Sequence, residues 1–172
     1  MRVFLALKSD QLLDAVIDDA CMAWQPLRCH DPRDRHLTLL FLGEKQLHEC
    51  YEIIETVDET LMEPRGALVW RAEQLGGFPP TKHKHWAWQG PSNDGLDQFR
   101  LRLSSALQLP MTQWLPHVTL AYGPISDAPV KPMVQTVTLS QLVLYRSLSQ
   151  EERVDQANWS KVRYAAVKIW DL

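Results

Sequence analysis

The chain has 172 residues, of which 45% are hydrophobic and 23% are charged, and its net charge is -3, all of which are ordinary values for a globular protein. The acidic balance argues against a protein that coats nucleic acid by bulk electrostatics, but a local site for one or two phosphates needs only a few donors. The length predicts a single domain over residues 1–172, built on one core or on two closely packed lobes.

Cysteine content and the first residues bear on the location of the protein. The three cysteines, Cys21, Cys29 and Cys50, have no metal-ligand spacing, and an odd number of them fits a reducing compartment. The apolar run over residues 3–7 is too short for a signal peptide or a membrane span. We therefore expect a cytoplasmic protein with no membrane partner.

Apolar periodicity in the first half predicts a strand, a helix, a strand and a second helix. The expected positions are a strand over 2–7, a helix between Asp10 and Pro26, a strand over 36–42 and a helix over 47–61. The second strand is preceded by a polar loop over 26–35, whose basic side chains are Arg28, His30, Arg33 and Arg35. Solvated loop charge is the simpler interpretation, and a positive rim that guides a polyanion towards His36 is the alternative.

The second half predicts more strands than helices. Strands are expected over 67–75 and 85–89, paired as a hairpin, with a turn at 76–80, then a helix capped by Asn93 or Asp94 and a strand over 117–122. Segments 134–139 and 142–144 could form one long bent strand, 153–159 is ambiguous, and 162–170 closes the chain as a strand.

A few residues in this half could suggest other sites. His83 and His85 have a spacing that could hold a metal, but no third ligand is near in sequence, so we expect exposed loop residues and no metal site. Trp86 is expected to lie on the same strand face as Trp88, where packing is a simpler role than stacking on bases.

The alternation of helices and strands, with hairpins, predicts an α+β fold with an antiparallel or mixed sheet. A short pattern occurs twice, about half a chain apart, as His36-Leu37-Thr38-Leu39 and His117-Val118-Thr119-Leu120. This separation predicts two related lobes that face a central cleft, each with one copy of the pattern and with its helices outside.

Side-chain alternation along a strand gives the repeated pattern a chemical meaning. His36 and Thr38 are expected on one face, with Leu37, Leu39 and Phe41 opposite. His117 and Thr119 are likewise expected to share a face, opposite Val118 and Leu120. If the two strands lie side by side, two imidazoles and two hydroxyls converge.

Two converging histidines can divide acid and base work near neutral pH. One neutral ring can deprotonate water while one protonated ring gives a proton to the leaving oxygen, and threonine hydroxyls can donate to phosphate oxygens. This chemistry suits in-line attack on a phosphodiester and requires no metal. A single copy of the pattern would favour a half-buried histidine bonded to a carbonyl, whereas the matched pair favours a site. The chain has no Gly-rich phosphate loop and no Gly-x-Ser-x-Gly motif.

At these residues the chain resembles the two-histidine (2H) phosphoesterase superfamily, and in particular the bacterial RNA 2′,3′-cyclic phosphodiesterases, also called 2′-5′ RNA ligases. The resemblance covers nearly the whole chain: residues 2–7, 36–44 with the HxTx motif and the trailing Leu-Gly-Glu, 78–79, 86–88, 116–121, 142–147 and Tyr164.

The resemblance implies a hydrolase that opens 2′,3′-cyclic phosphates at an RNA or nucleotide end and leaves a 2′-phosphate. By this likeness, His36 is the proton donor to the 3′ oxygen, His117 is the proton acceptor from water, and Thr38 and Thr119 bind the phosphate. No cofactor is implied. The expected partner is RNA with a cyclic phosphate end or a cyclic nucleotide, and the expected state is a monomer.

One position departs from the family. An arginine is common three residues after the second threonine, whereas this chain has Tyr122, which could stack on a base or pack. We predict Tyr122 and Arg35 as further substrate contacts. The missing charge could come from elsewhere, and the candidates are Lys82, Lys84, Arg35 and Arg146.

Two other functions stay open at this stage. One is 2′-5′ RNA ligation or attack on another phosphodiester, because the same acid and base can exchange roles in the reverse reaction. The other is a non-catalytic module that binds an RNA end or a nucleotide and keeps the pocket.

Overall fold

A computed structural model describes residues 1–9, 28–62, 66–79, 85–122, 131–154 and 162–172. The predicted helix between Asp10 and Pro26, together with Lys82, His83 and Lys84, lies outside these described residues. Within the described ranges, no helix is both long and apolar enough to cross a membrane.

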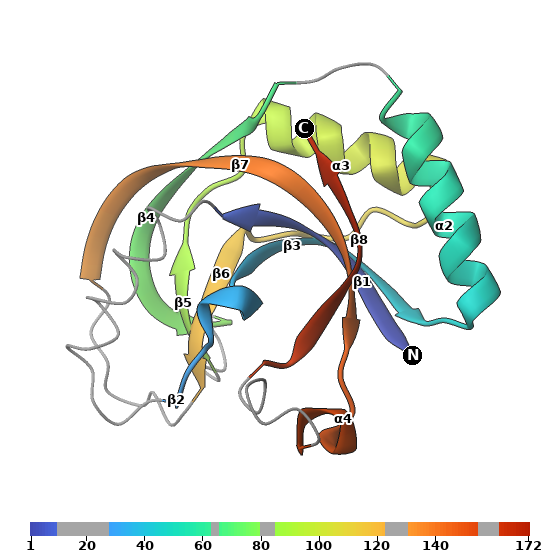
Figure 1. Cartoon of the computed structure of the whole chain (residues 1–172). Helices are drawn as coiled ribbons and strands as arrows, with labels where there is room; N and C mark the ends of the chain where they lie inside the picture. The colour runs from blue at the N-terminus through green and yellow to red at the C-terminus, as the bar shows by residue number, and fades with distance from the viewer. Residues whose placement is uncertain (10–27, 63–65, 80–84, 123–130, 155–161) are drawn as a thin grey trace.

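The fold is α+β, as predicted, and its strands form one antiparallel sheet (Figure 1). Along the sheet the order is β1 (Arg2–Ser9), β3 (His36–Glu44), β6 (His117–Tyr122), β5 (His85–Gln89), β4 (Leu68–Phe78), β7 (Lys131–Ser147) and β8 (Tyr164–Asp171). The short β2 (Arg28–Cys29) pairs with β6, and β1 also pairs with β7. This last pairing closes six of the strands into a ring.

Strand β7 connects the two halves of the sheet. Its first part pairs with β4, from Leu75 opposite Lys131 to Leu68 opposite Leu139. Its second part pairs with β1 and β8. The predicted long strand over 134–144 is therefore confirmed and is longer than expected, and Figure 1 shows its strong bend. The two halves share this strand, and the predicted relation between them as lobes stays a prediction.

Two long helices cover the outside of the sheet next to each other, as Figure 1 shows. Helix α2 (Leu47–Thr60) begins with a capping box, in which Gln46 and Glu49 each bond the other's backbone. Helix α3 (Asp94–Ala106) is capped by Asn93, whose side chain accepts from the Leu96 amide at 3.1 Å. Their inner faces enter the same core through Cys50, Ile53, Val57, Leu96, Phe99 and Leu103.

Tryptophans fill the centre of the core. Trp70, Trp86 and Trp88 are at most 1% exposed, and the rings of Trp70 and Trp88 lie 6.0 Å apart. The predicted packing role of Trp86 and Trp88 is thus confirmed.

The predicted alternation along the first motif strand is wrong at Phe41. Leu5 pairs with Leu40 and Ala6 pairs with Thr38, so Leu39 is an extra residue opposite β1. This bulge buries two successive side chains, Leu39 and Leu40, and leaves Phe41 66% exposed. Phe41 therefore shares the face of His36 and Thr38 and does not lie with Leu37 and Leu39.

Other differences concern element boundaries. The turn predicted at 76–80 is strand as far as Phe78, because Gly76, Gly77 and Phe78 pair with Ala87, Trp86 and His85. The loop predicted over 26–35 contains β2 and a 3-10 turn, η1 (Pro32–Asp34). Helix α4 (Gln150–Val154) includes the first two residues of the ambiguous stretch 153–159, whose other residues lie outside the described ranges, and the last strand begins at Tyr164.

Arg100 joins α3 to the first motif strand. It is 5% exposed, its Nε donates to the Leu39 carbonyl at 3.0 Å, and its Nη1 and Nη2 donate to the carbonyl and hydroxyl of Thr112 at 3.1 and 3.2 Å. We expect Arg100→Leu to lower the free energy of unfolding by about 2–4 kcal/mol, because buried acceptors lose their donors. Urea unfolding followed by circular dichroism measures the change.

The matched control is Arg71→Leu, since the Arg71 side chain is 64% exposed and we expect a change within about 0.5 kcal/mol. Equal effects of the two substitutions would contradict the structural role of Arg100.

Candidate active site

The two motif strands lie side by side, as the sequence predicts. β3 and β6 pair through Leu37 and Val118, each of which is the residue between the histidine and the threonine of its motif. Because neighbours on a strand point to opposite faces, this pair brings both histidines and both threonines to the other face. The convergence of the four side chains comes from one antiparallel contact.

The four side chains line a cavity of about 420 Å³. They come from the starts of β3 and β6, and the described residues around them are Arg2, Phe4, His30, Phe41, Phe78, Pro79, His85, Tyr122, Ser147 and Tyr164. The cavity is large enough for a small ligand.

Each motif histidine is oriented by a carbonyl two residues earlier. His36 Nδ1 lies 2.6 Å from the Asp34 carbonyl oxygen, and His117 Nδ1 lies 2.8 Å from that of Leu115. A carbonyl can only accept, so Nδ1 carries the hydrogen in both rings. This leaves Nε2 of each ring to take or give a proton.

His36 lies in an aromatic surrounding. Its ring is 4.9 Å from the ring of Phe4, 5.3 Å from Tyr145 and 5.2 Å from Tyr164. Burial here lowers the pKa of His36 to about 4, the hydrogen bond to Asp34 opposes that shift, and the nearby His117 adds to it. The ring is neutral at pH 7 when no ligand is bound.

The ring of His117 packs against an aromatic side chain. The Phe78 ring stacks on it with centroids 3.7 Å apart and an interplanar angle of 20°. Burial lowers the pKa of His117, the bond to Leu115 opposes the shift, and His85 adds to it. Both motif histidines therefore favour the neutral form in the free protein.

The motif threonines supply the donors. Thr38 and Thr119 both line the cavity, and neither hydroxyl is bonded to another described residue. The backbone of Thr38 is held from behind by Trp114, whose Nε1 donates to the Thr38 carbonyl at 2.9 Å. Two hydroxyls and two Nε2 atoms are thus available to one ligand.

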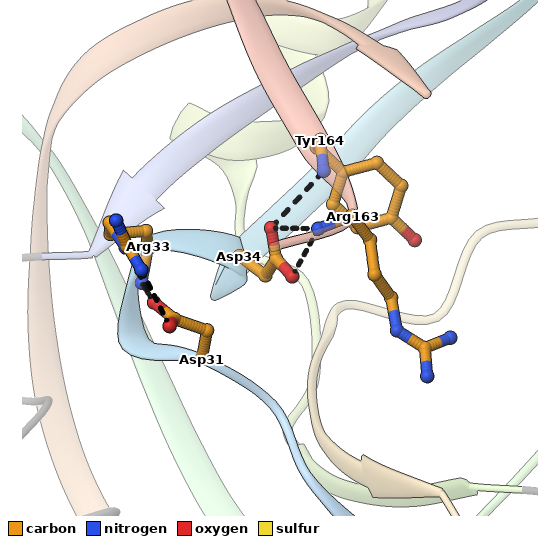
Figure 2. A network of polar contacts seen from close by, with 5 residues as sticks. All are labelled: Asp31, Arg33, Asp34, Arg163 and Tyr164. Atoms are coloured by element: carbon orange, nitrogen blue, oxygen red, sulfur yellow. Dashed lines mark hydrogen bonds and ion pairs between the residues drawn. The ribbon is translucent and has the colours of Figure 1, made fainter. Parts of the chain in front are cut away.

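The Asp34 carboxylate holds the segment at the start of β8, as Figure 2 shows. Its carboxylate accepts from the amide of Arg163 at 2.8 Å and from the amide of Tyr164 at 3.2 Å. Asp34 is 1% exposed, and burial raises its pKa to about 6. One residue therefore aligns His36 through its carbonyl and holds the start of β8 through its carboxylate.

The basic loop before the first motif is not simply solvated. Arg33 is paired with Asp31, with its Nε 2.8 Å from Asp31 Oδ1 (Figure 2). Arg35, a predicted substrate contact, is 1% exposed and is not among the residues that line the cavity. His30 is 5% exposed and lines the cavity.

His30, which the sequence indicated only as part of a possible basic rim before His36, lies in the wall of the cavity. Neither of its ring nitrogens is bonded within the described part of the chain, and its amide donates to the Leu120 carbonyl of β6 at 2.7 Å. Burial, then the charge of Arg163, then electrostatic interactions with His36, His85 and Arg35 lower its pKa to about 3. Its neutral ring offers one donor and one acceptor to a ligand. It lies six residues before His36, in a loop with no periodicity that could have indicated this.

His85 begins the strand predicted over 85–89, which is confirmed, but its expected exposure at the edge of a loop is wrong. His85 is the first residue of β5, opposite Tyr122, and both line the cavity. The His85 ring lies 4.5 Å from the Tyr122 ring. The pairing of β5 with β6 brings it to the site.

Tyr122, which is predicted to contact substrate, lines the cavity, and its ring contacts those of His30 and His85. The guanidinium of Arg163 lies 4.3 Å from the centre of its ring. Among the predicted sources of positive charge, Arg146 is paired with Glu152. Arg2, which lines the cavity and makes no ion pair with a described residue, was missed.

The described residues contain no group of three or more His, Cys, Asp or Glu arranged to hold a metal ion.

No protein-family model matches the chain, and no curated protein sequence does either. Solved structures do match. TT0787 of Thermus thermophilus superposes with a TM-score of 0.78 at 21% identity, covering 100% of this chain and 98% of that one. E. coli LigT complexed with 3′-AMP gives 0.74 at 19% identity, covering 99% and 97%. E. coli LigT complexed with NADP+ gives 0.76 at 19% identity over the same shares.

These likenesses extend over the full chain and establish its fold as that of LigT. The fold predicted from the resemblance to two-histidine phosphoesterases is thereby confirmed.

The role of Asp34 predicts an effect on stability. We expect Asp34→Ala to lower the free energy of unfolding by about 2–3 kcal/mol, because the amides of Arg163 and Tyr164 lose a buried acceptor. Asp34→Asn keeps one acceptor oxygen and is expected to be milder. Denaturant midpoints at pH 7 measure both, and an Asp34→Ala protein as stable as the parent would contradict the assignment.

Proposed function

We propose that the chain is a metal-independent hydrolase that opens 2′,3′-cyclic phosphates at RNA or nucleotide ends and leaves a 2′-phosphate. The observation that carries this proposal is the Leu37–Val118 pair, which brings two His-x-Thr motifs to one face with Nε2 of each histidine available. The solved complexes of E. coli LigT with phosphate and with 3′-AMP, on the same fold, support it.

In the proposed reaction, His117 Nε2 takes a proton from water as the water oxygen bonds to phosphorus. The bond from phosphorus to the 3′ oxygen breaks on the opposite side, and His36 Nε2 gives that oxygen a proton. Thr38 and Thr119 donate to the non-bridging oxygens, where the negative charge is held. Each proton transfer contributes about 100-fold or more.

The donor histidine needs the bound substrate in order to become protonated. Burial keeps both histidines neutral in the free protein, so the donor has to acquire its proton when the phosphate binds. A bound phosphodiester carries a negative charge, which favours the protonated form of a neighbouring imidazole. Arg2 and Arg163 add positive charge near the cavity for the same ligand.

Ligation of 2′-5′ RNA is the same displacement with the 5′ hydroxyl of a second RNA in place of water. Its oxygen bonds to phosphorus and gives its proton to His117, while the bond from phosphorus to the 3′ oxygen breaks and His36 protonates that oxygen. The fold shared with structures named LigT keeps this second activity open. A cytoplasmic location and a monomeric state remain predictions.

The first test incubates the protein, with chelator, with a 2′,3′-cyclic mononucleotide and with an RNA ending in that group. We expect a 2′-phosphate product, and a fall in kcat/KM of about 100-fold or more in both His36→Ala and His117→Ala. His48→Ala, an exposed substitution on α2, is the matched control and should leave the rate unchanged.

Two results would overturn the proposal. One is a 3′-phosphate product, and the other is turnover that survives loss of either motif histidine. Binding without turnover would favour the non-catalytic module. A 4-nitrophenyl phosphodiester, whose leaving group departs without a proton, separates the two roles: His36→Ala should retain much of the rate on it, and His117→Ala should not.

The pKa shifts predict where the pH profile lies. Above both pKa values the donor lacks its proton, and below both the base is protonated, so kcat/KM should be bell-shaped. Since burial lowers the pKa of His36 to about 4 and that of His117 below its usual 6.5, both limbs should lie below pH 6.5. We expect kcat/KM to be falling at pH 7, and kcat to peak at higher pH because bound phosphate raises the donor pKa. A rise in kcat/KM up to pH 8 would contradict this.

A further inference from the structure

A second cavity of about 480 Å³ adjoins the first. The two share a border of four residues, Thr38, Phe41, Phe78 and His117. Beyond that border the walls are largely apolar and include Leu109, Pro110, Trp114 and Leu115. A ligand that fills the first cavity can therefore continue directly into the second.

Phe41 reaches the border because of the bulge in β3, and it lies there with the aromatic side chain of Phe78. Without the extra Leu39, Phe41 would point into the core, and with it the ring is 66% exposed at the junction of the two cavities. Bulges beside sites commonly redirect a side chain in this way. An exposed aromatic ring next to a phosphate site is a surface on which a base can stack.

The second cavity is held in place independently of a ligand. Trp114 donates to the Thr38 carbonyl, and Arg100 lies 5.2 Å from the centre of the Trp114 ring. Its wall is therefore tied to the first motif strand and to α3.

The charged side chain in the wall of the second cavity does not favour a phosphate there. Arg100 is the one Lys or Arg among the described residues that line it. Its guanidinium already donates to the Leu39 carbonyl and to both oxygens of Thr112. Within this described lining, no free cation remains for a second phosphate. The exposed amide of Gln113 is left at the rim for hydrogen bonds to an uncharged group.

We propose that the second cavity binds the nucleobase of the nucleotide that precedes the cyclic phosphate end, with Phe41 as its stacking surface. Each cavity lies within the size range of sites that hold small molecules, so the first can accept the terminal nucleotide and the second its neighbour. This inference rests on the proposed function and deepens it: the substrate is an oligonucleotide end in preference to a free cyclic mononucleotide.

The test compares kcat/KM for a dinucleotide and a mononucleotide, both with a 2′,3′-cyclic phosphate. We expect the parent protein to prefer the dinucleotide by about tenfold or more, and Phe41→Ala to reduce that ratio about tenfold, because stacking of one base on one aromatic side chain is lost. Phe41→Tyr should keep the ratio. Tyr51→Ala removes an equally exposed aromatic ring from α2, 58% exposed, and should leave both substrates unaffected.

A binding measurement separates this inference from the proposed function. Titration calorimetry with the di- and mononucleotide 2′-phosphates reports the second cavity even if no turnover occurs. Tighter binding of the dinucleotide, lost in Phe41→Ala, supports the subsite. No preference in binding or rate overturns the subsite, while turnover of both substrates would leave the proposed function intact. Preferential binding without any hydrolysis overturns the proposed function and supports the subsite.

Discussion

The contact between β3 and β6 is the constraint on which the site depends. These strands pair at one position, Leu37 with Val118, while β1 and β5 pair with them along most of their lengths. A longer pairing of β3 with β6 would continue the sheet through the region between the motifs. The single pair brings the motifs together and lets the strands separate on either side, which leaves room for the two adjoining cavities. The closure of β7 onto β1 holds the two halves at this distance.

The backbone just before each motif histidine sets the orientation of its ring. For His36, that backbone is in turn held by residues far along the chain. Both histidines use the same device, a bond from Nδ1 to a carbonyl two residues earlier, so the tautomer follows from the backbone. For His36 that carbonyl belongs to Asp34, whose carboxylate binds amides 129 and 130 residues away. The position of the first histidine is therefore coupled to the start of β8, which also carries Tyr164 to the cavity wall.

Much of this arrangement follows from patterns that a sequence displays. Apolar periodicity predicts α2, α3 and β7, and the repeat of His-x-Thr predicts two motifs on one face, since alternation along a strand is a local rule. The failures have a common cause in contacts that no local rule contains. A bulge opposite β1 turned Phe41 to the other face, strand pairing brought His85 to Tyr122, and a loop without periodicity brought His30 beside β6. The burial of Arg35 could not be predicted for the same reason, because burial of a loop arginine depends on its tertiary surroundings, and its contact with substrate stays a prediction.

In the complex that we propose, the two cavities bind different parts of one RNA end. The first cavity is lined by histidines, threonines and Tyr122. Burial lowers the pKa of His30, His36 and His117, so their rings stay neutral until an anion binds. The second has aromatic and apolar walls and a guanidinium already engaged by backbone and hydroxyl oxygens, so an anion gains nothing there. A cyclic phosphate end that is preceded by another nucleotide fits both environments. Its negative charge favours the protonated form of the donor histidine in the first cavity, and the base of the preceding nucleotide can cover Phe41 in the second. Free phosphate would fit only the first cavity, and a free base would fit only the second. In this proposal, base recognition and proton transfer are therefore coupled at the junction formed by Phe41 and His117.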